Sequence, residues 1–256
     1  LRLSRGLGDV YKRQGEGLRA GVETYHALKA ELRQDGLLGG IGDEGGFAPN
    51  LPSNEDGLRY LVRAIEAAGY STEQMGIALD VASTEFHRDG AYHIDGQAID
   101  SEGLADLYSG WLDEYPILSI EDGFDEDDWL GWSRFTAREG HRVQIVGDDL
   151  FVTQSERLAR GIEMQAANAM LVKVNQVGTV TETLEAMDLA SRNGFNNVVS
   201  HRSGETEDVT IADLCVGTRA GQIKTGAPAR SDRTAKYNQL LRIASEVSDY
   251  ASPFDV

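Results

Sequence analysis

Cysteine is almost absent from the sequence: Cys215 is the single cysteine among 256 residues. One cysteine cannot form a disulfide within the chain, which excludes the small proteins that disulfides hold together. Cys215 lies in the apolar run I-A-D-L-C-V-G. We therefore expect a buried thiol that packs in the core and takes no part in chemistry.

Positive charge is also scarce, with 24 Lys and Arg against 42 Asp and Glu and a formal net charge of −18 at pH 7. Such an acidic chain is a poor partner for nucleic acid or for an anionic membrane surface. The sequence has no apolar run near the length of about 18 residues expected of a membrane span, and no signal-peptide pattern. We expect a cytoplasmic globular protein.

The first 14 residues differ in composition from the rest of the sequence. They contain one acid and four basic residues, which are Arg2, Arg5, Lys12 and Arg13. We interpret residues 1–14 as a non-native segment and residues 15–256 as one domain. A native basic tail is the alternative interpretation.

Most of the remaining sequence alternates between apolar strands and helical patterns. Two helices are expected first, over 16–35 and from Asn54 as the N-cap residue, and a later helix is expected to be capped by Ser101. Apolar strands are predicted near 76–80, 117–121, 143–147, 169–174, 197–200 and 221–224. This alternation predicts parallel strands covered by helices. The predicted fold class is α/β, a TIM-type (β/α)8 barrel of about 250 residues, here incomplete with two leading helices and six strand–helix units.

The predicted strands end in polar residues. In chain order these are Asp80, Glu121, Asp148, Lys173, His201 and Lys224. The carboxyl ends of the strands form the site in (β/α)8 barrels. A single acid there is more often a helix cap or a solvated side chain, but three in succession predict a metal site. Oxygen ligands without cysteine favour Mg²⁺ over Zn²⁺.

Two further residues, Lys173 and Glu44, are candidates for the site. A divalent cation and Lys224 beside Lys173 would disfavour its charged form and make it a general base; the alternative is a lysine extended to solvent at the rim. Glu44 lies in G-D-E-G-G, where the glycines would let the backbone approach a ligand closely. Taken alone, that segment predicts only a tight turn.

The segment H-R-S-G-E from His201 to Glu205 follows a predicted strand and precedes a predicted helix. Arg202 and Ser203 with the amides of a helix N-terminus would bind an anion, and phosphate is the natural ligand. A capping box that begins at Ser203 is the alternative, and both can hold together. The acidic run 125–128 is interpreted as favourable charge at a helix N-terminus.

Seven segments together resemble the enolase family. They are G-D-E-G-G-F-A-P-N, A-L-D-V-A-S-T-E-F, S-I-E-D-G-F-D-E-D-D-W, Q-I-V-G-D-D-L-F-V-T, L-V-K-V-N-Q-V-G-T, V-S-H-R-S-G-E-T-E-D and I-K-T-G-A-P-A-R-S-D-R. The resemblance extends from about Gly15 to the end of the sequence. It implies a lyase that reversibly dehydrates 2-phosphoglycerate to phosphoenolpyruvate in glycolysis, with two Mg²⁺ ions.

The resemblance also implies a role for each site residue. Lys173 corresponds to the base that removes the C2 proton, and Glu44 to the acid that assists departure of the C3 hydroxyl. The ligands of the first Mg²⁺ correspond to Asp80, Glu121 and Asp148. Substrate contacts correspond to His201, Arg202, Ser203 and Lys224, the last of these to the carboxylate.

The sequence departs from the family pattern at its start, where an α+β domain and two barrel strands are expected but not found. We therefore expect a partial gene product that needs those parts for activity. Members of the family are usually homodimers, and the oligomeric state of this chain stays open. One alternative is a fragment without catalytic activity, or a binding protein. Another is an acid-sugar dehydratase, which the H-R-S-G sequence disfavours because it suits a phosphate group.

Overall fold

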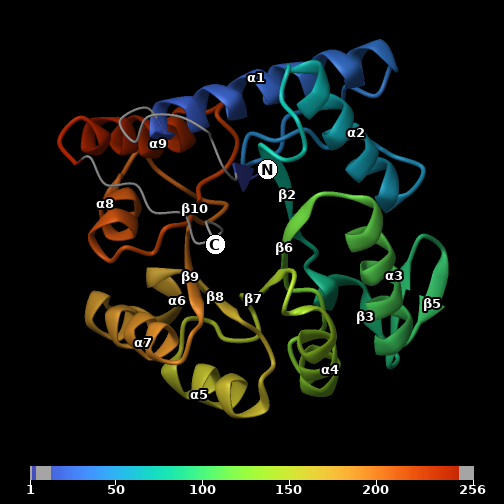
Figure 1. Ribbon diagram of the computed structural model, residues 1–256, viewed down its shortest axis with the longest axis vertical. Helices are drawn as coiled ribbons and strands as arrows, with labels where there is room; N and C mark the ends of the chain where they lie inside the picture. The colour runs from blue at the N-terminus through green and yellow to red at the C-terminus, as the bar shows by residue number, and fades with distance from the viewer. Residues whose placement is uncertain (1, 4–12, 248–256) are drawn as a thin grey trace. The chain divides into compact units, whose positions relative to one another are not determined.

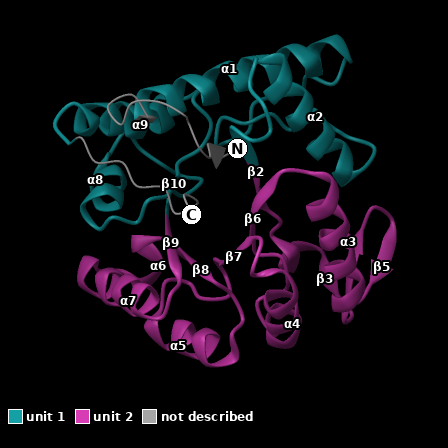
Figure 2. Ribbon diagram, in the orientation of Figure 1, with its two compact units in different colours: residues 1–76, 199–256 teal, residues 77–198 magenta. Residues whose placement is uncertain are grey.

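The structure is a computed structural model of the 256-residue chain, and it describes residues 2–3 and 13–247. The expectation of a non-native segment over 1–14 falls mostly outside the described residues. The chain forms two compact units (Figure 2): unit 1 comprises 1–76 and 199–256, and unit 2 comprises 77–198. No helix within the described ranges has the length and apolar character needed to cross a membrane.

Within each unit the parallel strands pair with one another in chain order (Figure 1). They are β2 (Met75–Asp80), β6 (Ile117–Glu121), β7 (Gln144–Gly147), β8 (Ala169–Val172), β9 (Asn196–Ser200) and β10 (Ile223–Lys224). The registered pairs β2–β6, β6–β7 and β7–β8 lie in unit 2, and the pair β9–β10 lies in unit 1. All of these pairs are parallel, which confirms the predicted α/β class with six parallel strands.

Unit 2 also contains the helices that follow its strands. They are α3 (Ser101–Glu114), α4 (Trp129–Glu139), α5 (Ser155–Met164), the short α6 (Val174–Val177) and α7 (Val180–Arg192). Between β2 and α3 the chain forms the 3-10 helix η2 (Ser83–Phe86) and an antiparallel sheet of β3 (His87–Arg88), β4 (Ala91–Ile94) and β5 (Gln97–Ile99). This small sheet is an excursion of the chain between β2 and α3.

Unit 1 contains the helices at both ends of the chain, together with the first strand. They are β1 (Arg2–Leu3), α1 (Arg13–Gln34), α2 (Asn54–Ala67), α8 (Thr210–Gly217) and α9 (Ser231–Ala244). The strand β1 pairs antiparallel with the start of β2. Helix α1 packs against α2 and α9, and α8 packs against α9. Cys215 on α8 is buried and its thiol donates to the carbonyl of Gln222, so the predicted core thiol is confirmed.

Parallel strands that are covered by helices are buried, and their sequences are therefore mostly apolar. Every residue of β7 and β8 is buried, and Val146, Ala169, Leu171 and Val198 form one cluster. Burial of this kind fixes where each strand ends and therefore where the polar residue that follows it is placed.

Two predicted helix caps were wrong by one residue. The N-cap of α2 is Ser53, which accepts from the amide of Asp56 while the Asp56 carboxylate accepts from the amide of Ser53. The N-cap of α3 is Asp100, which accepts from the amide of Gly103. In both cases the preceding residue has the extended backbone that brings its side-chain oxygen over the first turn.

The charges before α4 lie as predicted. Asp128 is the N-cap residue of α4, and its carboxylate accepts the amide of Gly131 at 3.0 Å. The same carboxylate accepts the hydroxyls of Tyr92, at 2.8 Å, and Ser101. The acidic run therefore stabilises the helix start and links it to the neighbouring hairpin.

Candidate active site

The predicted site residues form two groups, and each group lies within one unit. Unit 2 contains Asp80, Glu121, Asp148 and Lys173, and unit 1 contains Glu44, His201, Arg202, Ser203 and Lys224.

Three carboxylates occupy the carboxyl ends of neighbouring strands in unit 2. Asp80 and Glu121 are register partners at the ends of β2 and β6. Asp148 comes directly after β7. Asp80 is exposed, whereas Glu121 and Asp148 are buried. The strand ends thus present the three predicted metal ligands along one edge of the sheet.

Lys173 contacts the third of these carboxylates. It follows β8 as the N-cap residue of α6, because the strand ends at Val172 rather than at the predicted residue 174. The Lys173 ammonium forms an ion pair with Asp148 Oδ2, and Gln176 Nε2 donates to Asp148 Oδ1 at 3.1 Å. The Lys173 amide donates to Thr153 Oγ1 at 2.9 Å. Backbone and side chain of Lys173 are therefore both held by hydrogen bonds.

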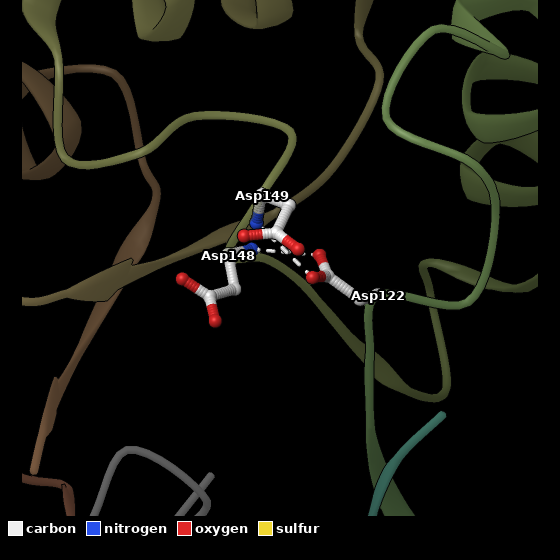
Figure 3. A group of neighbouring side chains, drawn as sticks. All are labelled: Asp122, Asp148 and Asp149. Carbon is white, nitrogen blue, oxygen red and sulfur yellow. Dashed lines mark hydrogen bonds between the residues drawn. The ribbon is translucent and has the colours of Figure 1, made fainter. Parts of the chain in front are cut away.

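Asp122 is a residue of this group that the sequence reasoning missed. Its Oδ1 accepts the amide of Asp148 at 2.8 Å, and its Oδ2 accepts the amide of Asp149 at 3.0 Å. Figure 3 shows the carboxylate of Asp149 facing that of Asp122 and the carboxylate of Asp148 turned away. Burial raises the pKa of Asp122 to about 7, while the two amides that it accepts act in the opposite direction.

The donor atoms here suit a hard cation. One carboxylate oxygen from each of Asp122, Asp148 and Asp149 lies within 4.8 Å of the other two. Carboxylate oxygens are the ligands that Mg²⁺ and Ca²⁺ take in proteins. The position of Asp122 beside Glu121 was the one sequence signal that could have identified it.

Glu44 and His201 form the centre of the group in unit 1. Glu44 Oε2 lies 3.3 Å from His201 Nε2. The hydrogen bond with His201 lowers the pKa of Glu44 to about 2, against the effect of partial burial, and the charges of Lys224 and Arg233 add to the lowering. Glu44 is therefore ionised near neutral pH in this structure.

Glycines shape the loop that carries Glu44. Gly45 has a φ of +83° and Gly226 a φ of +84°, values that favour glycine. A Cβ at Gly226 would lie 2.8 Å from the Glu44 carbonyl, which accepts the amide of Ala227 at 2.9 Å. The loop that carries Glu44 thus approaches the chain's own segment after β10 closely, at Gly45 and at Gly226.

Arg233 holds the loops of unit 1 together, and no sequence signal pointed to it. Its guanidinium is fully buried and donates to the carbonyls of Arg202 (2.8 Å), Ser203 (2.7 Å) and Asp43 (3.1 Å). It also contacts His201 Nδ1. Because a guanidinium only donates, Nδ1 must accept, which leaves the ring proton on Nε2 beside Glu44.

The helix predicted directly after Glu205 begins later than expected, at Thr210. Its N-cap residue is Val209, with no side-chain cap, so the capping box proposed for Ser203 does not form. Glu205 instead accepts the amide of Arg202 at 3.0 Å and the ammonium of Lys236 at 2.7 Å. These contacts hold an irregular segment on which Arg202 and Ser203 are exposed.

Lys224 lies at the end of β10, opposite Ser200 of β9. Its carbonyl accepts the amide of His201 at 2.9 Å. His201 and Lys224 thus lie on adjacent strand ends. Glu44 is close enough to both for them to lower its pKa. This part of unit 1 offers positive charge and hydrogen-bond donors, which suit an anionic ligand.

Comparison with known proteins agrees with this arrangement. The model of the family described as "Enolase, C-terminal TIM barrel domain" matches residues 11–254. An enolase of Beutenbergia cavernae is 60% identical over 237 residues, which are 92% of this chain and 56% of that protein. An enolase of Kineococcus radiotolerans is 58% identical over 92% of this chain and 55% of its own length. The chain thus spans little more than half the length of these relatives. Because the family model matches nearly the whole sequence, the chain belongs to the enolase family and carries its C-terminal TIM barrel domain.

Proposed function

We propose that this chain provides the barrel of a Mg²⁺-dependent hydro-lyase that reversibly dehydrates 2-phosphoglycerate to phosphoenolpyruvate. The observation that carries the proposal is the ion pair of Lys173 with Asp148 at the ends of adjacent strands, in a chain 60% identical to a protein named enolase. The proton to be removed lies next to the carboxylate of the substrate and is only weakly acidic. Its removal requires a base close to a metal site, and the protein carboxylates beside Lys173 could form that site.

In the proposal, Asp80, Glu121 and Asp148 would hold the first Mg²⁺ ion, and a second ion is expected from the family. Bound Mg²⁺ supplies positive charge that neutralises the carboxylate of the substrate. Three carboxylates on neighbouring strand ends fit such an ion because their oxygens are hard ligands. The chain's other residues would orient the substrate and move its protons.

The Lys173 ammonium would first release a proton, which positive charge from a bound Mg²⁺ would favour, and its neutral Nζ atom would then accept the C2 proton. A lysine base combined with Mg²⁺ is already described for the enolase superfamily. Here the Lys173 backbone is fixed by the Thr153 hydroxyl and its ammonium by Asp148. Fixation of the reacting group favours proton transfer because little orientation has to be gained in the reaction.

Glu44 would give a proton to the hydroxyl that leaves C3. A carboxyl group with a pKa of about 2 has no proton to give at neutral pH. Glu44 can therefore act as the acid only after substrate binding has changed the charges around it. His201 would keep its carboxylate oriented.

Arg202, Ser203 and Lys224 would bind the anionic groups of the substrate. Arg202 and Ser203 are exposed on the segment after His201, and their side chains suit a phosphate. Lys224 would contact the carboxylate.

The test is turnover of 2-phosphoglycerate, followed by the ultraviolet absorbance of phosphoenolpyruvate with and without Mg²⁺. Two proteins are assayed: the chain alone, which we expect to be inactive, and the chain joined to the part of the Beutenbergia cavernae enolase that it does not cover. We expect Mg²⁺-dependent turnover from the joined protein, loss of activity in Lys173→Ala, and full activity in the control Lys29→Ala.

Absence of turnover in a folded joined protein would contradict the proposal, as would activity that survives Lys173→Ala. Non-phosphorylated hydroxy acids form a second arm of the assay. Turnover of those acids instead of 2-phosphoglycerate would favour an acid-sugar dehydratase.

A further inference from the structure

Asp122 joins the edge of the sheet at which the proposed metal ligands lie. It follows Glu121 directly, and its side chain is 6% exposed. Its two carboxylate oxygens accept the amides of Asp148 and Asp149 at 2.8 and 3.0 Å (Figure 3). The carboxylate of Asp122 therefore fixes the backbone of the turn that carries Asp148.

The backbone of Asp122 connects the same turn to two strands. Its amide donates to the carbonyl of Val146 in β7 at 3.0 Å. Its carbonyl accepts the amide of Ser83 at 3.1 Å and the hydroxyl of Ser83 at 2.6 Å, three residues after Asp80. One residue thus links the ends of β2, β6 and β7, and each of those strand ends carries one proposed ligand.

A direct ligand role for Asp122 agrees less well with these contacts. If the carboxylate turned to a cation, the amides of Asp148 and Asp149 would lose their acceptor. A buried donor without an acceptor is unfavourable, and here two donors would be affected at once. Asp122 also has a φ of +45°, an uncommon conformation for a residue other than glycine, which places its side chain toward the turn.

We propose that Asp122 is a positioning residue that fixes the three ligand-bearing strand ends and so sets the affinity of the site for Mg²⁺. The proposal rests on the proposed function for the identity of the metal. The part that concerns the backbone is independent of it, because these contacts join groups of the chain itself.

The first experiment compares backbone amide exchange in the metal-free chain by NMR. In Asp122→Asn one oxygen is replaced by a donor, which cannot accept an amide. We expect one of the two amides, that of Asp148 or that of Asp149, to lose its acceptor and to exchange about 10- to 100-fold faster. The control is Asp188→Asn, which removes a carboxylate that pairs with Arg192 on the exposed face of α7. Unchanged exchange at Asp148 and Asp149 would overturn the proposal.

The second experiment measures binding of Mg²⁺ alone by calorimetry. We expect Asp122→Asn to bind Mg²⁺ about 10- to 100-fold more weakly with the same number of ions per chain, which is typical when a residue that orients a ligand is replaced. Equal affinity would overturn the proposal, and so would the loss of one ion, because that result identifies a direct ligand. If the unaltered chain binds no Mg²⁺, the proposed function is contradicted, and the amide exchange still decides the role of Asp122.

A milder variant is needed if Asp122→Asn fails to fold. Ser83→Ala removes only the hydroxyl that donates to the Asp122 carbonyl. We expect it to weaken Mg²⁺ binding about two- to tenfold, with no loss of bound ions. Unchanged affinity in a folded Ser83→Ala protein would overturn the proposal.

Discussion

Replacement of Arg233 by methionine is expected to destabilise unit 1 strongly. The guanidinium is fully buried on α9, and it donates to three backbone carbonyls as well as contacting His201. Its Nε also lies 3.0 Å from Asp232 Oδ2. Methionine retains most of the aliphatic volume, so the change removes the hydrogen bonds with a small change in packing.

The loss of stability can be estimated from the backbone carbonyls that remain without a donor. The carbonyls of Asp43, Arg202 and Ser203 would lose a charged donor, and removal of one partner from a buried charged network costs about 3–5 kcal/mol. In a domain of about 150–250 residues each kcal/mol lowers the melting temperature by about 2–4 °C. We therefore expect the Arg233→Met midpoint to fall by about 6–20 °C.

The assay is urea unfolding followed by circular dichroism, together with a thermal scan. The matched control is Arg242→Met on the same helix, because Arg242 is exposed and bonds only Gln239 among the contacts resolved for its side chain. Its effect should stay within about 0.5 kcal/mol. A loss below 1 kcal/mol in Arg233→Met, or equal losses in the two variants, would refute the reasoning.

Three further results are expected. In Gly161→Ala the new Cβ would lie 2.3 Å from the buried ring of Phe151, so the free energy of unfolding in urea should fall by about 1–3 kcal/mol. The control is Gly110→Ala on α3, where an added Cβ would meet no neighbouring group of the described chain within 4 Å, and which should leave the stability unchanged or raise it. Equal changes in the two variants would contradict this. Burial raises the pKa of Cys215 to about 11, so its thiol should react slowly with Ellman's reagent at pH 8 until urea unfolds the protein; fast reaction in the folded state would disprove its burial. The pKa of Glu44 is lowered from 4.5 to about 2, so the stability that it provides is present above pH 4.5 and lost as the pH falls towards 2. The unfolding free energy of Glu44→Gln should vary less across that window, and superimposable pH profiles would show the contacts of Glu44 to be unimportant for stability.

The strand ends could be predicted because local patterns determine them. Apolar runs of four to six residues form the buried strands β7, β8 and β2, and the first polar residue at or after the end of each run is the one at the sheet edge. This pattern places Asp80, Asp148 and Lys173 without knowledge of the rest of the fold. In the structure Lys173 forms an ion pair with Asp148 at this edge, a contact that the sequence pattern alone did not predict.

The residues that organise the loops could not be predicted in this way. Arg233 donates to the carbonyl of Asp43, 190 positions away in the sequence, and Asp122 accepts amides 26 and 27 positions away. Such bonds depend on backbone groups that lie together only in the folded chain, and backbone groups are identical at every position of a sequence. The late start of α8 has the same origin, since Glu205 holds the preceding segment through the amide of Arg202 and the ammonium of Lys236.

In the proposed reaction Lys173 removes the C2 proton, and Glu44 acts on the later departure of the hydroxyl. Exchange of the C2 hydrogen of 2-phosphoglycerate with deuterated solvent, measured by NMR in the presence of Mg²⁺, separates these two steps. For the chain joined to the remainder of the Beutenbergia cavernae enolase, the account predicts exchange in the unaltered protein, none in Lys173→Ala, and retained exchange without phosphoenolpyruvate formation in Glu44→Gln. Exchange that persists in Lys173→Ala would contradict it.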